Sequence, residues 1–254
     1  MSWDPDQYAR FGGERLRPAR DLVAAVPLAS PARIADLGCG DGRATQLLAA
    51  RWPAARIVGV DSSQAMLDAA ARLGLDATWQ CAGIDAWRPD RPFDLVFSNA
   101  ALHWLSGHET LFPRLAEAVT PGGALAVQMP RNFAAPSHAA LFDLAESPRW
   151  RSRLAGLVRR EPVADPVWYY DVLASRMRSV EIWETEYLHA LSGERPVVDW
   201  LKGTWLRPFL DALPREEADA FEAEYADLMA AAYPRRADGV TLFPFRRLFI
   251  VAMR

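Results

Sequence analysis

The feature that most constrains the fold is a short apolar segment that runs directly into a glycine-rich loop. Residues 33–37 (Arg-Ile-Ala-Asp-Leu) predict a buried strand, the loop carries Gly38, Gly40 and Gly42, and residues 44–52 have the pattern of a helix. Glycine lets the backbone turn tightly and lets a ligand approach the main chain without a Cβ in the way. This arrangement predicts one corner of a parallel α/β sheet with a nucleotide-like ligand bound at it.

Two acidic residues decide which ligand suits this loop. Asp36 stands before the glycines, and Asp61 ends a second predicted strand at residues 56–60, about 20 residues after the loop. A carboxylate in the second position can accept hydrogen bonds from both hydroxyls of a ribose. A dinucleotide site would need a third glycine at Arg43 or Ala44, and Asp36 would repel a pyrophosphate but attract a cationic amino group. The loop therefore predicts S-adenosylmethionine, which carries an ammonium, a sulfonium and a ribose, rather than NAD.

Strand and helix patterns alternate through the first half of the chain. Further strands are predicted at residues 78–82, 93–99 and 124–129, and helices at residues 18–26, 64–73 and 108–119. Pro18 is expected to begin the first of these helices, and Asp61-Ser62-Ser63 to cap the second. Residues 120–123 are a predicted turn. The alternation predicts an α/β fold with a doubly wound, mostly parallel sheet.

The pattern changes after Pro130. Residues 132–166 are expected to be mostly helical, and two more strands are predicted near residues 180–188 and 245–253, which brings the sheet to seven strands. A hydrophobic segment with two helix patterns lies between these strands, at residues 190–240. A compact sheet would need only a short turn there, so the segment is an insertion.

These patterns suggest two parts of the chain. Residues 1–130 are predicted to form a core that binds S-adenosylmethionine, with N-terminal helices, and residues 131–254 to complete the sheet and carry helical insertions. We interpret the insertions as a cap over the cofactor end of the sheet. Helices packed elsewhere on the surface are the alternative.

Composition excludes several classes of protein. The formal net charge is −3, which gives no indication of nucleic acid as a partner, and no apolar run is long enough to span a bilayer. The two cysteines, Cys39 and Cys81, offer neither a disulfide framework nor metal-ligand spacing, so we expect a cytoplasmic protein without a metal. Cys39 is interpreted as a small apolar filler of the glycine loop. We also expect a monomer.

Several segments resemble one family of methyltransferases. These are residues 14–18 (ERLRP), 36–40 (DLGCG), 51–56 (RWPAAR), 59–63 (GVDSS), 99–105 (NAALHWL), 121–123 (PGG), 126–130 (AVQMP), 206–208 (LRP) and 248–252 (LFIVA). Together they are similar to the trans-aconitate 2-methyltransferases, along essentially the whole chain. The resemblance implies the Rossmann-like fold of class I methyltransferases. It also implies methyl transfer from S-adenosylmethionine to one carboxylate of trans-aconitate, a tricarboxylate, in the cytosol.

The resemblance and the strand ends together give a set of candidate cofactor residues. They are Asp36, Gly38, Gly40, Asp61, Ser62, Met66, Ile84, Asp85 and Asn99. One position departs from the family, because an acid usually precedes Ile84 there and reaches the adenine amino group, whereas this chain has Gly83. The contact is expected from Asp85 or from the backbone around Ile84.

The acceptor acid is expected to be held by cations. The candidate substrate-binding residues are Arg15, Arg17, Arg131, Arg207, Arg247, His103 and Tyr170, with Tyr8 and Tyr169 as weaker candidates for lids. A carboxylic acid is already ionised at neutral pH, so no residue needs to act as a general base. His103 is the one candidate for such a base.

Three other functions stay open at this point. A methyltransferase of the same fold could act on a hydroxyl or an amine, and it would then need a base such as His103. A non-catalytic module could bind S-adenosylmethionine as a sensor. An NAD-dependent dehydrogenase is the third alternative, and the missing third glycine argues against it.

Overall fold

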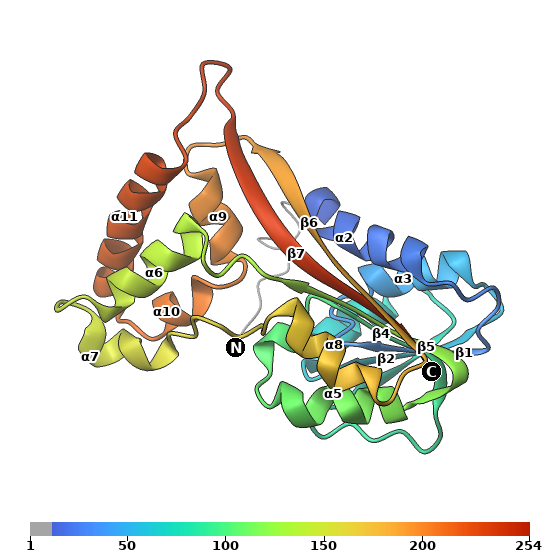
Figure 1. Cartoon of the computed structure of the whole chain (residues 1–254). Helices are drawn as coiled ribbons and strands as arrows, with labels where there is room; N and C mark the ends of the chain where they lie inside the picture. Colours follow the sequence, from blue (N-terminus) through green and yellow to red (C-terminus); the bar gives the residue numbers. More distant parts are fainter. Residues whose placement is uncertain (1–11) are drawn as a thin grey trace. The chain divides into compact units, whose positions relative to one another are not determined.

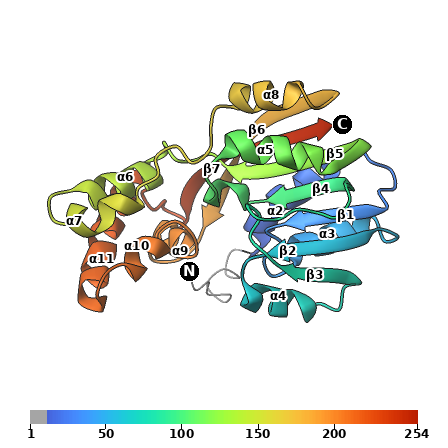
Figure 2. The same cartoon turned by 90° about the horizontal axis from the view of Figure 1, so that it is seen from below.

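The computed structural model describes residues 12–254, and within them seven strands form one sheet with the order β3-β2-β1-β4-β5-β7-β6 (Figures 1 and 2). The strands are β1 (Arg33–Leu37), β2 (Arg56–Asp61), β3 (Ala77–Cys81), β4 (Phe93–Asn99), β5 (Val119–Pro130), β6 (Ser179–Leu191) and β7 (Thr241–Met253). Strands β1 to β5 pair in parallel, and β7 pairs antiparallel with β5. The predicted seven-stranded, mostly parallel α/β sheet is therefore confirmed.

The helices follow the strands in the order that the sequence pattern predicts. They are α2 (Gly12–Ala25), α3 (Arg43–Arg51), α4 (Gln64–Ala71), η1 (Leu102–Trp104), α5 (His108–Glu117), α6 (Pro136–Glu146), α7 (Arg151–Leu154), η2 (Ala155–Leu157), α8 (Pro166–Ala174), α9 (Pro196–Lys202), α10 (Arg207–Asp211) and α11 (Arg215–Ala232). Helices α2 and α3 cover one face of the sheet, and α5 and α8 cover the other (Figure 1). Both faces of the parallel strands are thus buried, which suits their apolar composition.

Residues 12–254 divide between two compact units. One contains residues 15–130, 162–185 and 247–254, which hold strands β1 to β5 and the end of the chain. The other contains residues 131–161 and 186–246 together with the start of α2. Its helices α6, α9, α10 and α11 pack around an aromatic core, in which Trp200, Phe209, Phe221, Tyr225 and Phe243 are at most 1% exposed.

Several boundaries differ from the predicted ones. Pro18 was expected to begin a helix, but it lies inside α2, which begins at Gly12. A proline ring keeps a φ that suits a helix and costs only one backbone hydrogen bond, and the six residues 12–17 precede it in the same helix. The predicted turn at residues 120–123 lies inside the range of β5, where the register with β4 shifts and Gly122 has a φ of 82°. The turn is therefore an irregularity within a longer strand.

Membrane-spanning helices are not found in the described part of the chain. None of the helices within residues 12–254 has both the length and the apolar character that crossing a bilayer requires. Likewise, no three His, Cys, Asp or Glu side chains of these residues are grouped as a metal site would require.

Candidate active site

The glycine loop links the carboxyl ends of β1 and β2. The backbone N–H of Gly38 donates to the carbonyl of Val60 at 2.7 Å, and that of Gly40 donates to Asp61 Oδ2 at 2.9 Å. Gly38 and Gly40 have φ values of 73° and 56°, in the left-handed region that favours glycine. A Cβ at Gly38 would overlap the Cβ of Ala101, whereas one at Gly40 would meet no atom of residues 12–254 within 4 Å. The loop therefore presents bare backbone to a ligand on the side of Gly40.

Asp61 binds the backbone of two segments, the glycine loop at residues 38–42 and the start of helix α4. We call these segments, with the end of β2, the glycine corner. Its Oδ1 accepts from the backbone N–H of Ser63 at 2.9 Å, while Oδ2 holds Gly40. Ser63 caps helix α4 by accepting from the N–H of Met66, as the sequence predicted for this segment. A carboxylate has about four lone-pair sites, so Asp61 keeps acceptor capacity for the two hydroxyls of a ribose.

Asp36 is a carboxyl group in an unusual position. It is 1% exposed, and Thr45 Oγ1 on α3 donates to its Oδ2 at 2.7 Å. Burial raises the pKa of Asp36 to about 7, the Thr45 hydrogen bond opposes the rise, and the nearby charge of Asp61 adds to it. A buried carboxylate of this kind is stabilised by a cation placed beside it. Asp36 thus suits the cationic ammonium of S-adenosylmethionine.

The loop after β3 shows how Asp85 relates to Gly83. A Cβ built on Gly83 would overlap Asp85 Oδ1, so the Asp85 carboxylate occupies the space where a side chain at position 83 would begin. Arg114 on α5 fixes this loop by donating to the carbonyls of Ile84 at 3.1 Å and Trp87 at 2.6 Å. The Asp85 carboxylate therefore lies in the space that a side chain at position 83 would enter.

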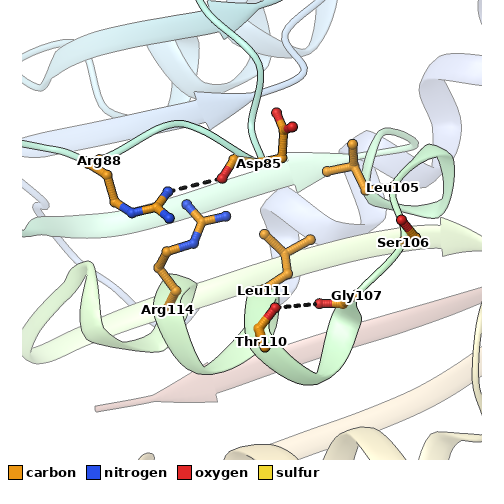
Figure 3. Close-up of a pocket in the computed structure, with 8 residues that line it drawn as sticks. All are labelled: Asp85, Arg88, Leu105, Ser106, Gly107, Thr110, Leu111 and Arg114. Atoms are coloured by element: carbon orange, nitrogen blue, oxygen red, sulfur yellow. Dashed lines mark hydrogen bonds between the residues drawn. The ribbon is translucent and has the colours of Figure 1, made fainter.

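A small cavity of about 180 Å³ lies on this side of the loop (Figure 3). It is lined by Asp85, Arg88, Leu105, Ser106, Gly107, Thr110, Leu111 and Arg114. Burial lowers the pKa of the Arg114 guanidinium, and the like charge of Arg88 lowers it further. Arg88 itself donates to the Asp85 carbonyl at 3.0 Å, so both arginines support the backbone of the loop.

The carboxyl end of β4 lies beside the glycine loop. Asn99 ends the strand, and Ala100 follows with a φ of 53°, a left-handed conformation that is costly for a residue with a Cβ. The N–H of Ala100 donates to the carbonyl of Gln128 on β5 at 2.9 Å, and Ala101 then contacts Gly38. The strained turn thus brings the chain after β4 against the loop after β1.

Two further residues, Cys39 within the glycine loop and His103 shortly after β4, are both buried. His103 is 3% exposed on η1, and its ring lies 4.8 Å from that of Trp104, centroid to centroid. Burial raises the pKa of the Cys39 thiol well above its usual range. Cys39 therefore stays a neutral thiol, in agreement with its interpretation as an apolar filler.

The remaining predicted residues are spread over several elements. Ser62 is exposed, Met66 on α4 is half-buried, and Tyr170 on α8 is 51% exposed. Tyr169 was considered as a lid, but it is wholly buried, with its hydroxyl 2.7 Å from His108 Nδ1. That expectation was wrong because Tyr169 packs against α5. Tyr8 lies outside the described residues.

The five predicted arginines also differ in their surroundings. Arg15 and Arg17 are on α2, where Arg17 is exposed and the side chain of Arg15 is outside the described part. Arg131 is half-buried directly after β5, and Arg207 on α10 donates to Asp211 at 2.8 Å. Arg247, on β7, is only 5% exposed.

Sequence reasoning missed four residues at this corner: Thr45, Ala101, Arg114 and Gln128. Gln128 alone left a signal, as the one amide in the apolar strand segment at residues 124–129. The other three act through contacts between distant segments, which a single sequence does not reveal.

Comparisons with known proteins agree with this geometry. A family described as a methyltransferase domain matches residues 34–123. Two solved structures share the fold: the YcgJ protein from Bacillus subtilis (TM-score 0.61, 13% identity, covering 94% of this chain and 98% of that one) and phosphoethanolamine N-methyltransferase 2 from Haemonchus contortus in complex with S-adenosyl-L-methionine (TM-score 0.58, 15% identity, 97% and 56%). Fold and site together define a class I methyltransferase that uses S-adenosylmethionine.

Relatives of known name narrow the class to one family. A trans-aconitate 2-methyltransferase from Azoarcus sp. is 48% identical over 253 residues, which cover 100% of this chain and 99% of the relative. One from Streptomyces coelicolor is also 48% identical and covers 100% and 87%. The chain belongs to the trans-aconitate 2-methyltransferase family.

Proposed function

We propose that this chain transfers a methyl group from S-adenosylmethionine to one carboxylate of trans-aconitate, which gives a monomethyl ester and S-adenosylhomocysteine. The observation that carries the proposal is the 48% identity to relatives of that name over the full length of the chain. The acid-lined glycine corner supports it, because Asp36 and Asp61 suit a cationic donor.

Different residues of the glycine corner bind different parts of the donor. When bound, S-adenosylmethionine supplies a methyl group on a positively charged sulfur, which a carboxylate oxygen can displace. Asp36 neutralises the donor's cationic end, Asp61 accepts from the ribose, and the backbone at Gly40 allows close approach. Ser62, Met66 and the carbonyl of Asn99 are proposed to complete the donor site.

Asp85 is proposed to accept a hydrogen bond from the adenine amino group. Its carboxylate fills the space beside Gly83, and the loop that carries it is fixed by Arg114 and Arg88. Ile84, which is 8% exposed, offers an apolar surface next to the purine. The family's contact would thus be kept with a different residue.

No side chain needs to remove a proton in this reaction. The acceptor carboxyl is ionised at neutral pH, so the enzyme acts by positioning the reactants and excluding water. Holding two reactants in near-attack geometry can contribute roughly 7–11 kcal/mol. The cations proposed to hold the other carboxylates are Arg15, Arg17, Arg131, Arg207 and Arg247, with His103 and Tyr170 as hydrogen-bonding partners.

A methyl-transfer assay with labelled donor across a panel of di- and tricarboxylic acids tests the proposal. We expect trans-aconitate to give the highest kcat/KM and a product that dilute base hydrolyses, as it does an ester. Transfer to an amine or hydroxyl, with a base-stable product, would contradict carboxyl methylation and favour the alternative in which His103 is a base.

We also propose that the protein works as a cytoplasmic monomer. The free cysteines Cys39 and Cys81 suit a reducing compartment. Size-exclusion chromatography with light scattering tests the oligomeric state.

A further inference from the structure

Gln128 is a buried amide with unmet hydrogen-bonding capacity. It is 0% exposed in β5, and neither Oε1 nor Nε2 has a hydrogen-bond partner among residues 12–254. The Oδ1 of Asn99, on the neighbouring strand, also has no hydrogen-bond partner among these residues. Buried polar atoms are nearly always paired, because an unpaired one loses its hydration without compensation. Two such amides in one place point to a ligand.

The pairing of the strands puts these groups on one face. Asn99 is the register partner of Gln128, and Gln128 is the register partner of Phe249 on β7. Partners across a ladder project to the same side of a sheet, as do residues two apart along a strand. Arg247, two residues before Phe249 and paired with Pro130, therefore projects to that side as well. A buried guanidinium and two amides thus line one side of the sheet edge.

The strand order places this group next to the donor corner. The donor residues lie at the ends of β1 and β2, and β4 and β5 follow on the other side of β1. The carboxyl ends of parallel strands meet at one edge of the sheet, where such folds bind ligands. Asn99 ends β4 at this edge and Gln128 lies two residues before the end of β5, both on the side of β1 that is away from Asp61.

We infer that the Gln128 carboxamide, through its unpaired Nε2, holds the carboxylate of the acceptor that receives the methyl group. This inference rests on the proposed function and adds a positioning residue to it. An amide N–H can hold one carboxylate oxygen while the other attacks, and it does so without neutralising the charge. A guanidinium in the same place would draw electron density from both oxygens through its two parallel hydrogen bonds. The neutral Gln128 amide thus binds the reacting carboxylate, and the arginines bind the other two carboxylates.

Replacement of Gln128 by methionine tests the inference, since methionine has a similar length and shape but donates no hydrogen bond. With the full chain and trans-aconitate, we expect Gln128→Met to lower kcat/KM for the acid about 10- to 100-fold, the effect of losing a hydrogen bond to a charged group. The Kd for S-adenosylmethionine should stay within twofold. The free energy of unfolding of the variant should be unchanged or higher, because an unpaired buried amide is replaced by an apolar group.

Met129→Leu is the matched control. Met129 is equally buried and adjacent in β5, but it projects to the opposite face, so its kinetics should match those of the unchanged protein. Gln128→Glu should lose more activity than Gln128→Met, since a carboxylate would repel the acceptor. If Gln128→Met kept the original kcat and KM, the inference would be overturned while the proposed function stood. If the unchanged protein esterified no acid of the panel, the proposed function would fail first, and the inference with it.

Discussion

At the scale of single residues, the protonation state of Asp36 affects both the stability of the fold and the binding of the donor. Its pKa of about 7 in the fold exceeds its ordinary value of 3.8, so the native state holds a proton that the unfolded chain releases between these values. Stability from this group is therefore present below pH 4 and is lost as the pH rises towards 7. We expect the unfolding free energy of the protein to fall over this range relative to that of Asp36→Asn, as urea titrations at several pH values would measure.

The same carboxyl gives donor binding a pH dependence of opposite sign. A cationic donor favours ionised Asp36, so affinity should rise as the pH increases through 7, with release of a proton on binding. Calorimetry in two buffers of different ionisation enthalpy measures that proton directly. In Asp36→Asn the release should be absent. An equal proton count in both proteins would show that another group is responsible.

A second residue-scale prediction concerns Asp85. If its carboxylate accepts from the adenine amino group, Asp85→Asn should weaken S-adenosylmethionine binding by about 10- to 100-fold, the usual loss for a charged hydrogen bond. Asp90→Asn is the control, because the side chain of Asp90 is 83% exposed. A donor analogue with hypoxanthine in place of adenine lacks the amino group, so the two proteins should bind it alike. An unchanged Kd for the natural donor in Asp85→Asn would assign the contact to the backbone instead.

At the scale of elements, the site depends on contact between the loops after β1 and β4. Gly38→Ala would drive a Cβ into Ala101, in addition to the left-handed strain of roughly 1–2 kcal/mol that a Cβ causes at its φ of 73°. We expect loss of donor binding and a lower unfolding free energy. Gly74→Ala separates the two effects, since Gly74 has a φ of 67° but a Cβ there would meet none of the described residues within 4 Å. Equal destabilisation with donor binding retained in both variants would mean that the loop contact does not shape the site.

At the scale of the whole molecule, the sequence predicted the order and type of the elements better than their ends. The glycine loop, Asp61 and the cap of α4 follow from local chemistry, so each could be read from a few adjacent residues. The extent of β5 is set by its neighbours: its pairing with β4 starts at Val119, before the predicted strand. Gln128 was missed because its significance comes from its partners in the sheet, which local patterns do not contain.

The reaction class itself makes a prediction about the whole enzyme. An acceptor carboxylate is fully ionised well above its ordinary pKa of about 4, so kcat at saturating donor and acid should be level from about pH 6.5 to 9. Over the same range kcat/KM for the donor should still rise through pH 7, because Asp36 titrates there only in the donor-free protein. His103→Gln should keep that level kcat profile even if its KM for the acid changes. A kcat that climbs with the ionisation of one histidine, and disappears in His103→Gln, would indicate a general base and therefore an acceptor other than a carboxylate.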